Sequence, residues 1–108
     1  MLSMLNVLFH ILPVVRCHVI IRGRVFDGSY HLLAEKSARQ HHVTGVMNVR
    51  DAFTSAPYIE MDIEGTEPVL DDYLTDLRKG TRDSSISHIS VQMLNNDRKH
   101  YGEFRRVS

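Results

Sequence analysis

The sequence of 108 residues contains one cysteine and no excess of charge of either sign. The single thiol, Cys17, excludes an internal disulfide, so no oxidising compartment is implied and we expect a cytoplasmic protein. Lys and Arg together number 13, and Asp and Glu together also number 13. Domains that bind nucleic acid normally carry a basic excess, so this balance argues against a nucleic-acid partner.

The chain also lacks a hydrophobic run long enough to span a bilayer, which needs about 20 apolar residues. Residues 1–15, which begin at Met1 and end at Val15, carry no Asp, Glu, Lys or Arg. They also lack the basic start and the small-residue cleavage site of a signal peptide. We therefore expect residues 1–16 to form an apolar extension that packs on the domain or mediates self-association. Residues 17–108 are predicted to form one domain.

No motif for a metal or a cofactor is present. The sequence has no H-x-x-x-H spacing and no pair of cysteines, so we expect neither a metal ion nor a cofactor. His41 and His42 are adjacent near a predicted helix end, so their side chains point in different directions. A cysteine inside a strand with no cationic neighbour is usually inert, so we do not expect Cys17 to be a nucleophile.

What the chain does have is a succession of short hydrophobic periodicities. Two-residue alternation predicts strands over residues 17–26, 45–51, 58–64, 86–93 and 101–107. Helical spacing predicts a helix over residues 30–42 and a second one between Thr66 and Gly80. This β-α-β-β-α-β order with a further short strand is typical of the α+β, ferredoxin-like sandwich, an antiparallel sheet with two helices on one face.

Two further expectations concern the strands. The first strand lies beside the third in this fold, which predicts that Arg22 and Arg24 oppose three acidic residues across a solvated outer face. Those residues are Glu60, Asp62 and Glu64. Such a face also argues against RNA binding, for which aromatic and basic groups are expected. The last two strands are predicted to be joined by a polar hairpin turn over residues 95–99.

The stretch G-R-V-F-D-G-S-Y-H at residues 23–31 joins the first strand to the first helix. The first N–H groups of a helix have no partner within it, and the helix dipole adds partial positive charge, so such a turn gathers donors around an anion. Ser29 is the predicted N-cap of the helix. We expect a phosphate loop here, built from Phe26, Asp27, Gly28, Ser29, Tyr30 and His31.

This stretch resembles the signature of the acylphosphatase family, G-R-V-Q-G-V-G-F-R, which is followed by a helix and then by G-W-V-x-N. Gly23, Arg24 and Val25 match the first motif, and Ala38 and Gly45 fall without a gap on the family's helix alanine and second-motif glycine. The resemblance extends over residues 17–107. It implies the ferredoxin-like fold and hydrolysis of the carboxyl-phosphate bond of acyl phosphates.

The resemblance also implies which residues act. In the family, the loop amides and the arginine that closes the loop hold the phosphoryl group, and an asparagine on the second strand positions the attacking water. The arginine's position is His31 here, and the asparagine's position is Val49. Asn48, one residue away, is a possible substitute, although it faces the opposite side of the strand unless a bulge turns it back. Asp27 replaces a loop glycine, and its carboxylate should repel phosphate.

Two hypotheses follow from these substitutions. The first is a binding or regulatory module, built on the acylphosphatase scaffold, that has lost efficient catalysis. The alternative is a weak or altered acylphosphatase, which the retained loop favours. Under either hypothesis, the expected ligand is a small anion or an acyl phosphate.

Overall fold

The computed structural model describes residues 12–94 and 98–107. Strands and helices alternate along these residues largely as predicted, although the first strand begins three residues earlier, at Val14. The elements are β1 (Val14–Arg24), α2 (Gly28–Gln40), β2 (Thr44–Arg50), β3 (Tyr58–Thr66), α3 (Glu67–Lys79), β4 (Ser85–Met93) and β5 (Phe104–Val107). Among the helices described, none is long and apolar enough to cross a membrane.

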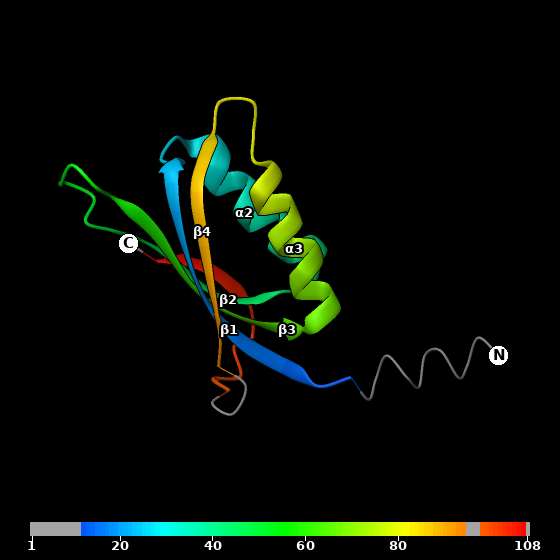
Figure 1. The fold of residues 1–108 in the computed structure, drawn as a ribbon. Coiled ribbons are helices and arrows are strands. Elements are labelled where there is room, and N and C mark those ends of the chain that lie inside the picture. Colours follow the sequence, from blue (N-terminus) through cyan, green and yellow to red (C-terminus); the bar gives the residue numbers. More distant parts are fainter. Residues whose placement is uncertain (1–11, 95–97, 108) are drawn as a thin grey trace.

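The strands form one sheet in the order β4-β1-β3-β2-β5, and α2 and α3 lie together on one face of it (Figure 1). β1 pairs antiparallel with β3 and β4, and β2 pairs antiparallel with β3. β5 runs parallel to β2. The predicted ferredoxin-like α+β fold is therefore confirmed, but the sheet is mixed and not wholly antiparallel.

The last two strands lie at opposite edges of the sheet, so the prediction that they form a hairpin is wrong. After β4 the chain forms β5, which pairs with the edge of β2 that does not pair with β3. Part of the connection is held by Glu64 at the end of β3, whose carboxylate accepts hydrogen bonds from the backbone N–H groups of Lys99 and Tyr101, both at 2.9 Å. These bonds keep the chain at the end of the sheet, away from β4.

The core lies between the sheet and the two helices. Its side chains come from alternate positions of the strands and from one side of each helix, and they include Cys17, Val19, Ile21, Met47, Ile59, Met61, Ile63, Ala34, Ala38, Leu70, Leu74, Leu77 and Phe104. Two buried tyrosines join the helices. The hydroxyl of Tyr30 donates to the carbonyl of Leu77, and that of Tyr73 donates to the carbonyl of Ala34, each at 2.9 Å. Buried hydroxyls need such partners because an unpaired polar group is costly inside a core.

The register of β1 corrects the prediction for Arg22 and Arg24. Ile20 is already opposite Glu60, and each step forward on β1 moves one step back on β3, so both arginines lie beyond the acidic residues. The guanidinium of Arg22 lies over the ring of Tyr58, 4.6 Å from its centre, a cation–π contact. Arg24 is opposite Ser85 of β4, after a bulge between Arg22 and Gly23.

Residues earlier in β1 and on β2 pair with the acidic side chains instead. Arg16 makes two hydrogen bonds to the carboxylate of Asp62, at 2.7 and 2.8 Å. Glu60 binds His18 at 2.9 Å and Arg50 at 2.8 Å. The predicted outer face with paired acidic residues therefore exists, but different partners form it, because the register places Arg16 and His18, and not Arg22 and Arg24, beside the acidic residues.

Candidate functional site

Asp27, in the loop between β1 and α2, is the N-cap residue of α2. Its Oδ1 accepts the backbone N–H of Tyr30 at 3.1 Å and the hydroxyl of Ser29 at 2.7 Å, and α2 begins at Gly28. The prediction that Ser29 is the N-cap is wrong, because Asp27 satisfies the first turn and Ser29 donates to it. The Ser29 hydroxyl and then the Tyr30 N–H lower the pKa of Asp27, so the loop holds a negative charge.

The Asp27 cap removes one of the loop N–H groups that could bind an anion. Tyr30 supplies one of the backbone N–H groups expected to face an anion, and that N–H is already bonded to the Asp27 carboxylate. Of the predicted loop residues, Gly28 and Ser29 are exposed, while Tyr30 is buried in the core. The chain therefore carries its own anion at the point where the resemblance implies a bound phosphoryl group.

His31 is buried at the start of α2, with an exposed fraction of 5%. Its Nε2 atom is inaccessible and has no hydrogen-bond partner among the described residues. Burial lowers the pKa of His31, and the positive charge of Arg106 lowers it further. Both effects favour the neutral imidazole, because the imidazolium would place a second N–H, unpaired, in a desolvated position near another cation.

His31 lines an open hollow of about 340 Å³ between the loop, β2 and β5. The hollow is lined by Phe26, His31, Val49, Ala52, Pro57 and Arg106. The structure thus brings together the two positions that the resemblance assigns to the family's arginine and asparagine, occupied here by His31 and Val49. Four of the six lining side chains are apolar, so the hollow offers few groups that could hold a phosphate or a water molecule.

Asn48 does not reach this hollow. Pairing of β2 with β3 is regular through Asn48 opposite Glu60 and Val49 opposite Ile59, so no bulge turns the asparagine inward. Asn48 instead lines a depression on the outer face of the sheet, together with His18 and Glu60. A substitute role for Asn48 in orienting water at His31 therefore has no geometric support.

Arg106 is a residue of the hollow that sequence reasoning missed. β5 pairs parallel with β2, with Phe104 opposite Gly45 and Arg106 opposite Met47. Phe104 is buried against Tyr73, so Arg106, two residues on, faces the same side of the sheet as the helices. The two-residue alternation in F-R-R-V indicates that Arg106 shares a face with Phe104. It places Arg106 at the hollow only if β5 pairs with β2 and not with β4.

The two glycines that match the family motifs have a steric reason to be glycine. Gly23 and Gly45 have φ angles of 139° and 142°, which side chains rarely adopt. A Cβ atom at Gly23 would lie 2.2 Å from the carbonyl oxygen of Ser85, and one at Gly45 would lie 2.1 Å from that of Asp62. Both glycines therefore allow close approach between neighbouring strands.

His18, His41 and His88 have hydrogen-bond partners or are exposed. His41 hydrogen bonds through Nε2 to Asp76 at 2.9 Å, and Ser37 donates to the same carboxylate oxygen at 2.7 Å. His18 binds Glu60, and His88 is exposed on β4. Within residues 12–94 and 98–107, no group of three or more His, Cys, Asp or Glu side chains is arranged to hold a metal ion.

Comparison with known proteins agrees with the motif resemblance. The family model described as Acylphosphatase matches residues 17–105. An acylphosphatase from Geobacillus kaustophilus (strain HTA426) is 27% identical over 88 residues, which cover 80% of this chain and 89% of that protein.

Solved structures support the same fold. The acylphosphatase from Bacillus subtilis superposes with a TM-score of 0.78 at 21% identity, covering 87% of this chain and 99% of the other. An acylphosphatase from Coxiella burnetii gives a TM-score of 0.73 at 18% identity, with coverages of 87% and 93%. Because the family model spans most of the sequence, from the first strand to the last, the chain belongs to the acylphosphatase family.

Proposed function

We propose that this chain is an acylphosphatase domain that binds a ligand without efficient hydrolysis, as a binding or regulatory module. The observation that carries the proposal is the composition of the hollow at the family's catalytic positions. His31 and Val49 face it together, and neither supplies the fixed charge or the amide group that the reaction uses in the family. Phosphoryl transfer depends mainly on positioning and electrostatic stabilisation, so these losses should remove most of the rate.

The electrostatics around His31 support the proposal. Burial and Arg106 both lower the pKa of His31, so at neutral pH the side chain offers one N–H and no net charge. Neutral imidazole lacks the charge and the bidentate fork with which arginine holds phosphate. Asp27 adds a carboxylate close by and takes the Tyr30 N–H, which weakens the loop as a phosphate cradle.

Val49 supports the proposal independently. It is an aliphatic side chain on β2, and it can neither donate to nor accept from a water molecule. Loss of one preorganised donor typically costs about 10²–10³ in rate in other enzymes. Loss at both positions should therefore leave little catalysis.

Hydrolysis of benzoyl phosphate tests the proposal. We expect negligible turnover by the parent chain and a measurable gain in the double variant His31→Arg/Val49→Asn. The matched control is His88→Arg/Val91→Asn, which makes the same changes on β4, away from the hollow, and should gain nothing. Turnover by the parent with kcat of about 1 s⁻¹ or more would contradict the proposal.

A weak acylphosphatase is the second candidate, and Arg106 is the observation that favours it. Its guanidinium belongs to the same hollow as His31 and lies near enough to affect that side chain's pKa. It could supply a positive charge to a phosphoryl group from β5. If the parent hydrolyses benzoyl phosphate and Arg106→Gln abolishes that activity, this second function replaces the first.

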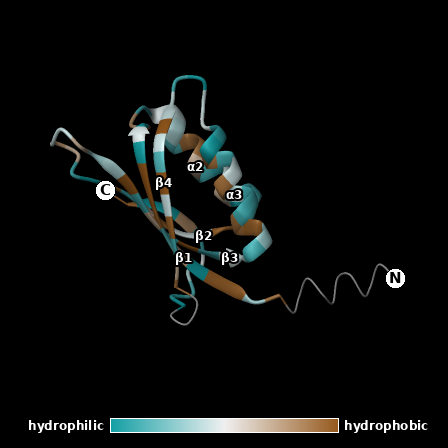
Figure 2. Cartoon of the chain, viewed as in Figure 1, coloured by the Kyte–Doolittle hydropathy of each residue, from teal (hydrophilic) through white to brown (hydrophobic). Residues whose placement is uncertain are grey.

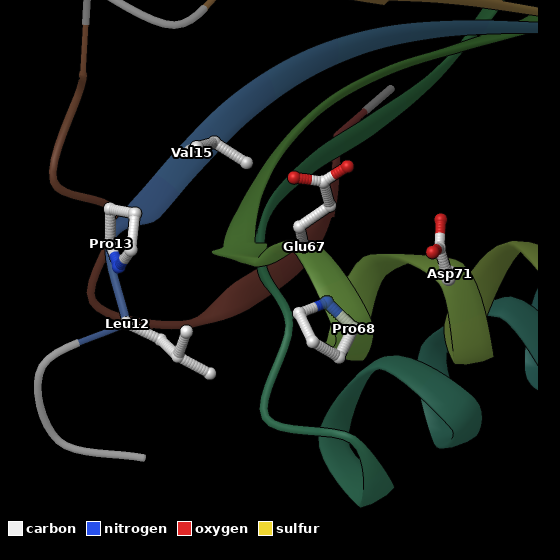
Figure 3. Close-up of a pocket in the computed structure, with 6 residues that line it drawn as sticks. All are labelled: Leu12, Pro13, Val15, Glu67, Pro68 and Asp71. Atoms are coloured by element: carbon white, nitrogen blue, oxygen red, sulfur yellow. The ribbon is translucent and has the colours of Figure 1, made fainter. Parts of the chain in front are cut away.

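Self-association through the apolar extension is a further part of the proposal. The prediction for residues 1–15 lies outside the described residues except at residues 12–15. There, an open hollow of about 370 Å³ separates β1 from α3 and is lined by Leu12, Pro13, Val15, Glu67, Pro68 and Asp71. The side chains of Leu12 and Pro68 point toward each other across it (Figure 3), and the start of β1 is hydrophobic (Figure 2).

Sedimentation of a chain lacking residues 1–11 tests this association, because the deletion leaves β1 intact from Val14. We expect a lower sedimentation coefficient than for the full chain, and equal coefficients would contradict the idea. A nucleic-acid partner is not proposed, and a cytoplasmic location stays a prediction.

A further inference from the structure

We propose that the hollow lined by Phe26, His31, Val49 and Arg106 binds a carboxylate with an apolar body, with the carboxylate at Arg106 and the apolar body over Val49. The inference rests on the proposed function, since it names the ligand class of a site that binds without hydrolysis. It departs from the family resemblance, which implies a phosphoryl group at the loop.

The walls of the hollow favour an apolar body. Phe26 and Val49 are partly buried and pack against the core, and Ala52 and Pro57 complete the wall from the loop after β2. At about 340 Å³ the hollow falls within the usual size range of small-molecule sites, which are mostly apolar with a few placed polar groups. An aromatic or branched aliphatic group would therefore be desolvated there at little cost.

The charges around the hollow favour a single negative charge. Arg106 is the cation among the lining residues, and it is exposed, so its planar guanidinium is available for bidentate pairing with a carboxylate. Asp27 is held ionised at the start of α2, near enough to act on His31. Its repulsion opposes a phosphate dianion more strongly than a monoanion, since electrostatic energy scales with charge.

The loop geometry argues in the same direction. A phosphate site at a helix start uses several backbone N–H groups at once, and Asp27 has taken that of Tyr30. A carboxylate needs fewer donors, and one guanidinium can supply two of them.

His31 contributes its side chain to the wall of the hollow. It is a lining residue, and it is 5% exposed. Its Nε2 atom is inaccessible and has no partner among the described residues, so this nitrogen is not offered to a ligand in the hollow. The polar contact of the carboxylate is therefore assigned to Arg106.

Titration with three small probes, followed by NMR of the backbone amides, tests the assignment. Benzoate carries the charge and the apolar body, benzamide carries the same body without charge, and inorganic phosphate carries charge without the body. We expect benzoate to shift the amides of Phe26, Val49 and Arg106 in a saturable manner, with Kd of about 1 mM or below. Benzamide and phosphate should bind at least about tenfold more weakly.

Two adjacent arginines provide a matched pair of variants. Arg106→Gln should weaken benzoate binding at least about tenfold, which is the loss expected for a charge-assisted pair. Arg105→Gln alters the preceding residue of β5, whose side chain lines the outer face near Val46, and it should leave the affinity unchanged. Both arginines are exposed, so neither substitution removes a core contact. Ala52→Asp should also weaken binding, since it adds a negative charge to the wall.

Three results would overturn the carboxylate assignment: tighter binding of phosphate than of benzoate, equal binding of benzamide, or equal effects of Arg105→Gln and Arg106→Gln. Absence of benzoate binding would overturn it as well. These outcomes are separable from failure of the proposed function, which is shown by hydrolysis of benzoyl phosphate by the parent. If the chain neither hydrolyses benzoyl phosphate nor binds benzoate, the carboxylate assignment is wrong and the proposed absence of efficient hydrolysis still stands.

Discussion

The carboxylate of Glu64 accepts the backbone N–H of Tyr101 at 2.9 Å, and this bond joins the end of β3 to the segment that leads into β5. The side chain of Glu64 is fully buried, and it also binds the N–H of Lys99 and the guanidinium of Arg98. Burial raises the pKa of Glu64, but the hydrogen bonds together outweigh it and hold the pKa below its usual range. Because β5 carries Arg106, this carboxylate helps to place a cation in the hollow about His31.

Substitution of Glu64 by Ala should destabilise the fold. A buried backbone N–H left without a partner costs on the order of 1–3 kcal/mol, and this applies to the half-buried Tyr101 more than to the exposed Lys99, whose N–H can bind water. Glu64→Gln keeps one acceptor oxygen and should cost less. Urea unfolding measures the loss, with Glu103→Ala as the exposed control on the same approach to β5. Similar stabilities for the two alanine variants would show that Glu64 does not stabilise the connection between β4 and β5.

Substitution of Asp27 by Ala should lower Tm by several degrees, because α2 loses the acceptor for the Tyr30 N–H. Asp27→Asn keeps an acceptor oxygen at the N-cap and should lose much less. Thermal unfolding followed by circular dichroism gives both values. If Ser29 capped the helix as the sequence suggested, Ser29→Ala would be the more damaging change, and that order of effects would contradict the cap described above.

Stability should fall below neutral pH through His31. Its pKa is lower in the folded chain than the unfolded value of about 6.5, chiefly through burial and then through Arg106. The unfolded chain therefore binds this proton first, so the contribution is complete above pH 6.5 and is lost as pH falls through the folded pKa. His31→Gln should flatten the decline in Tm between pH 7 and about 5.5. His88→Gln, on the exposed side of β4, should keep the slope of the parent, and equal slopes in all three proteins would refute the account.

A second decline in stability belongs to lower pH. The pKa values of Glu60, Asp62, Glu64 and Asp76 are all lowered in the fold. Their contributions are present above the unfolded values of about 4 and are lost as pH falls further. This decline should persist in His31→Gln, which separates it from the histidine effect.

Cys17 should resist alkylation in the folded chain. The thiol is fully buried, and burial, with a smaller effect of the Asp62 charge, raises its pKa to about 11. The thiolate is the reactive form, and it is scarce at pH 8 under these conditions. Iodoacetamide should therefore label Cys17 at pH 8 only as fast as the chain unfolds, whereas the chain in urea should react at the rate of an ordinary thiol. Comparable rates with and without urea would rule out this burial.

Much of the fold could be predicted from local pattern. Alternation predicted a strand over residues 58–64, and Ile59, Met61 and Ile63 in it are all buried, because side chains two residues apart share a face. Helical spacing and Gly80 bounded α3 correctly at its C-terminal end. These features depend on residues close together in the chain, so no knowledge of the partner elements was needed.

Part of the site could also be predicted. Phe26 and His31 belong to one continuous motif, and the family resemblance implied that the Val49 position acts beside the His31 position, which the structure agrees with. The prediction that Asn48 faces away was likewise a matter of strand parity, and the regular register at that point agrees with it. The N-cap was harder, because Asp27 and Ser29 compete within one turn and both are favoured at such positions.

Which strands became neighbours was decided only by long-range packing. The pairing of β1 with β3 places Arg22 and Arg24 beyond the acidic residues of β3. The pairing of β5 with β2 places Arg106 at the hollow. Both pairings join residues more than thirty positions apart in the chain. A strand's own sequence determines which side chains share a face, but not which edge of the sheet it joins. Here the buried carboxylate of Glu64 binds the connection after β4, so that β5 pairs with β2 and its alternate residue, Arg106, comes to lie beside His31.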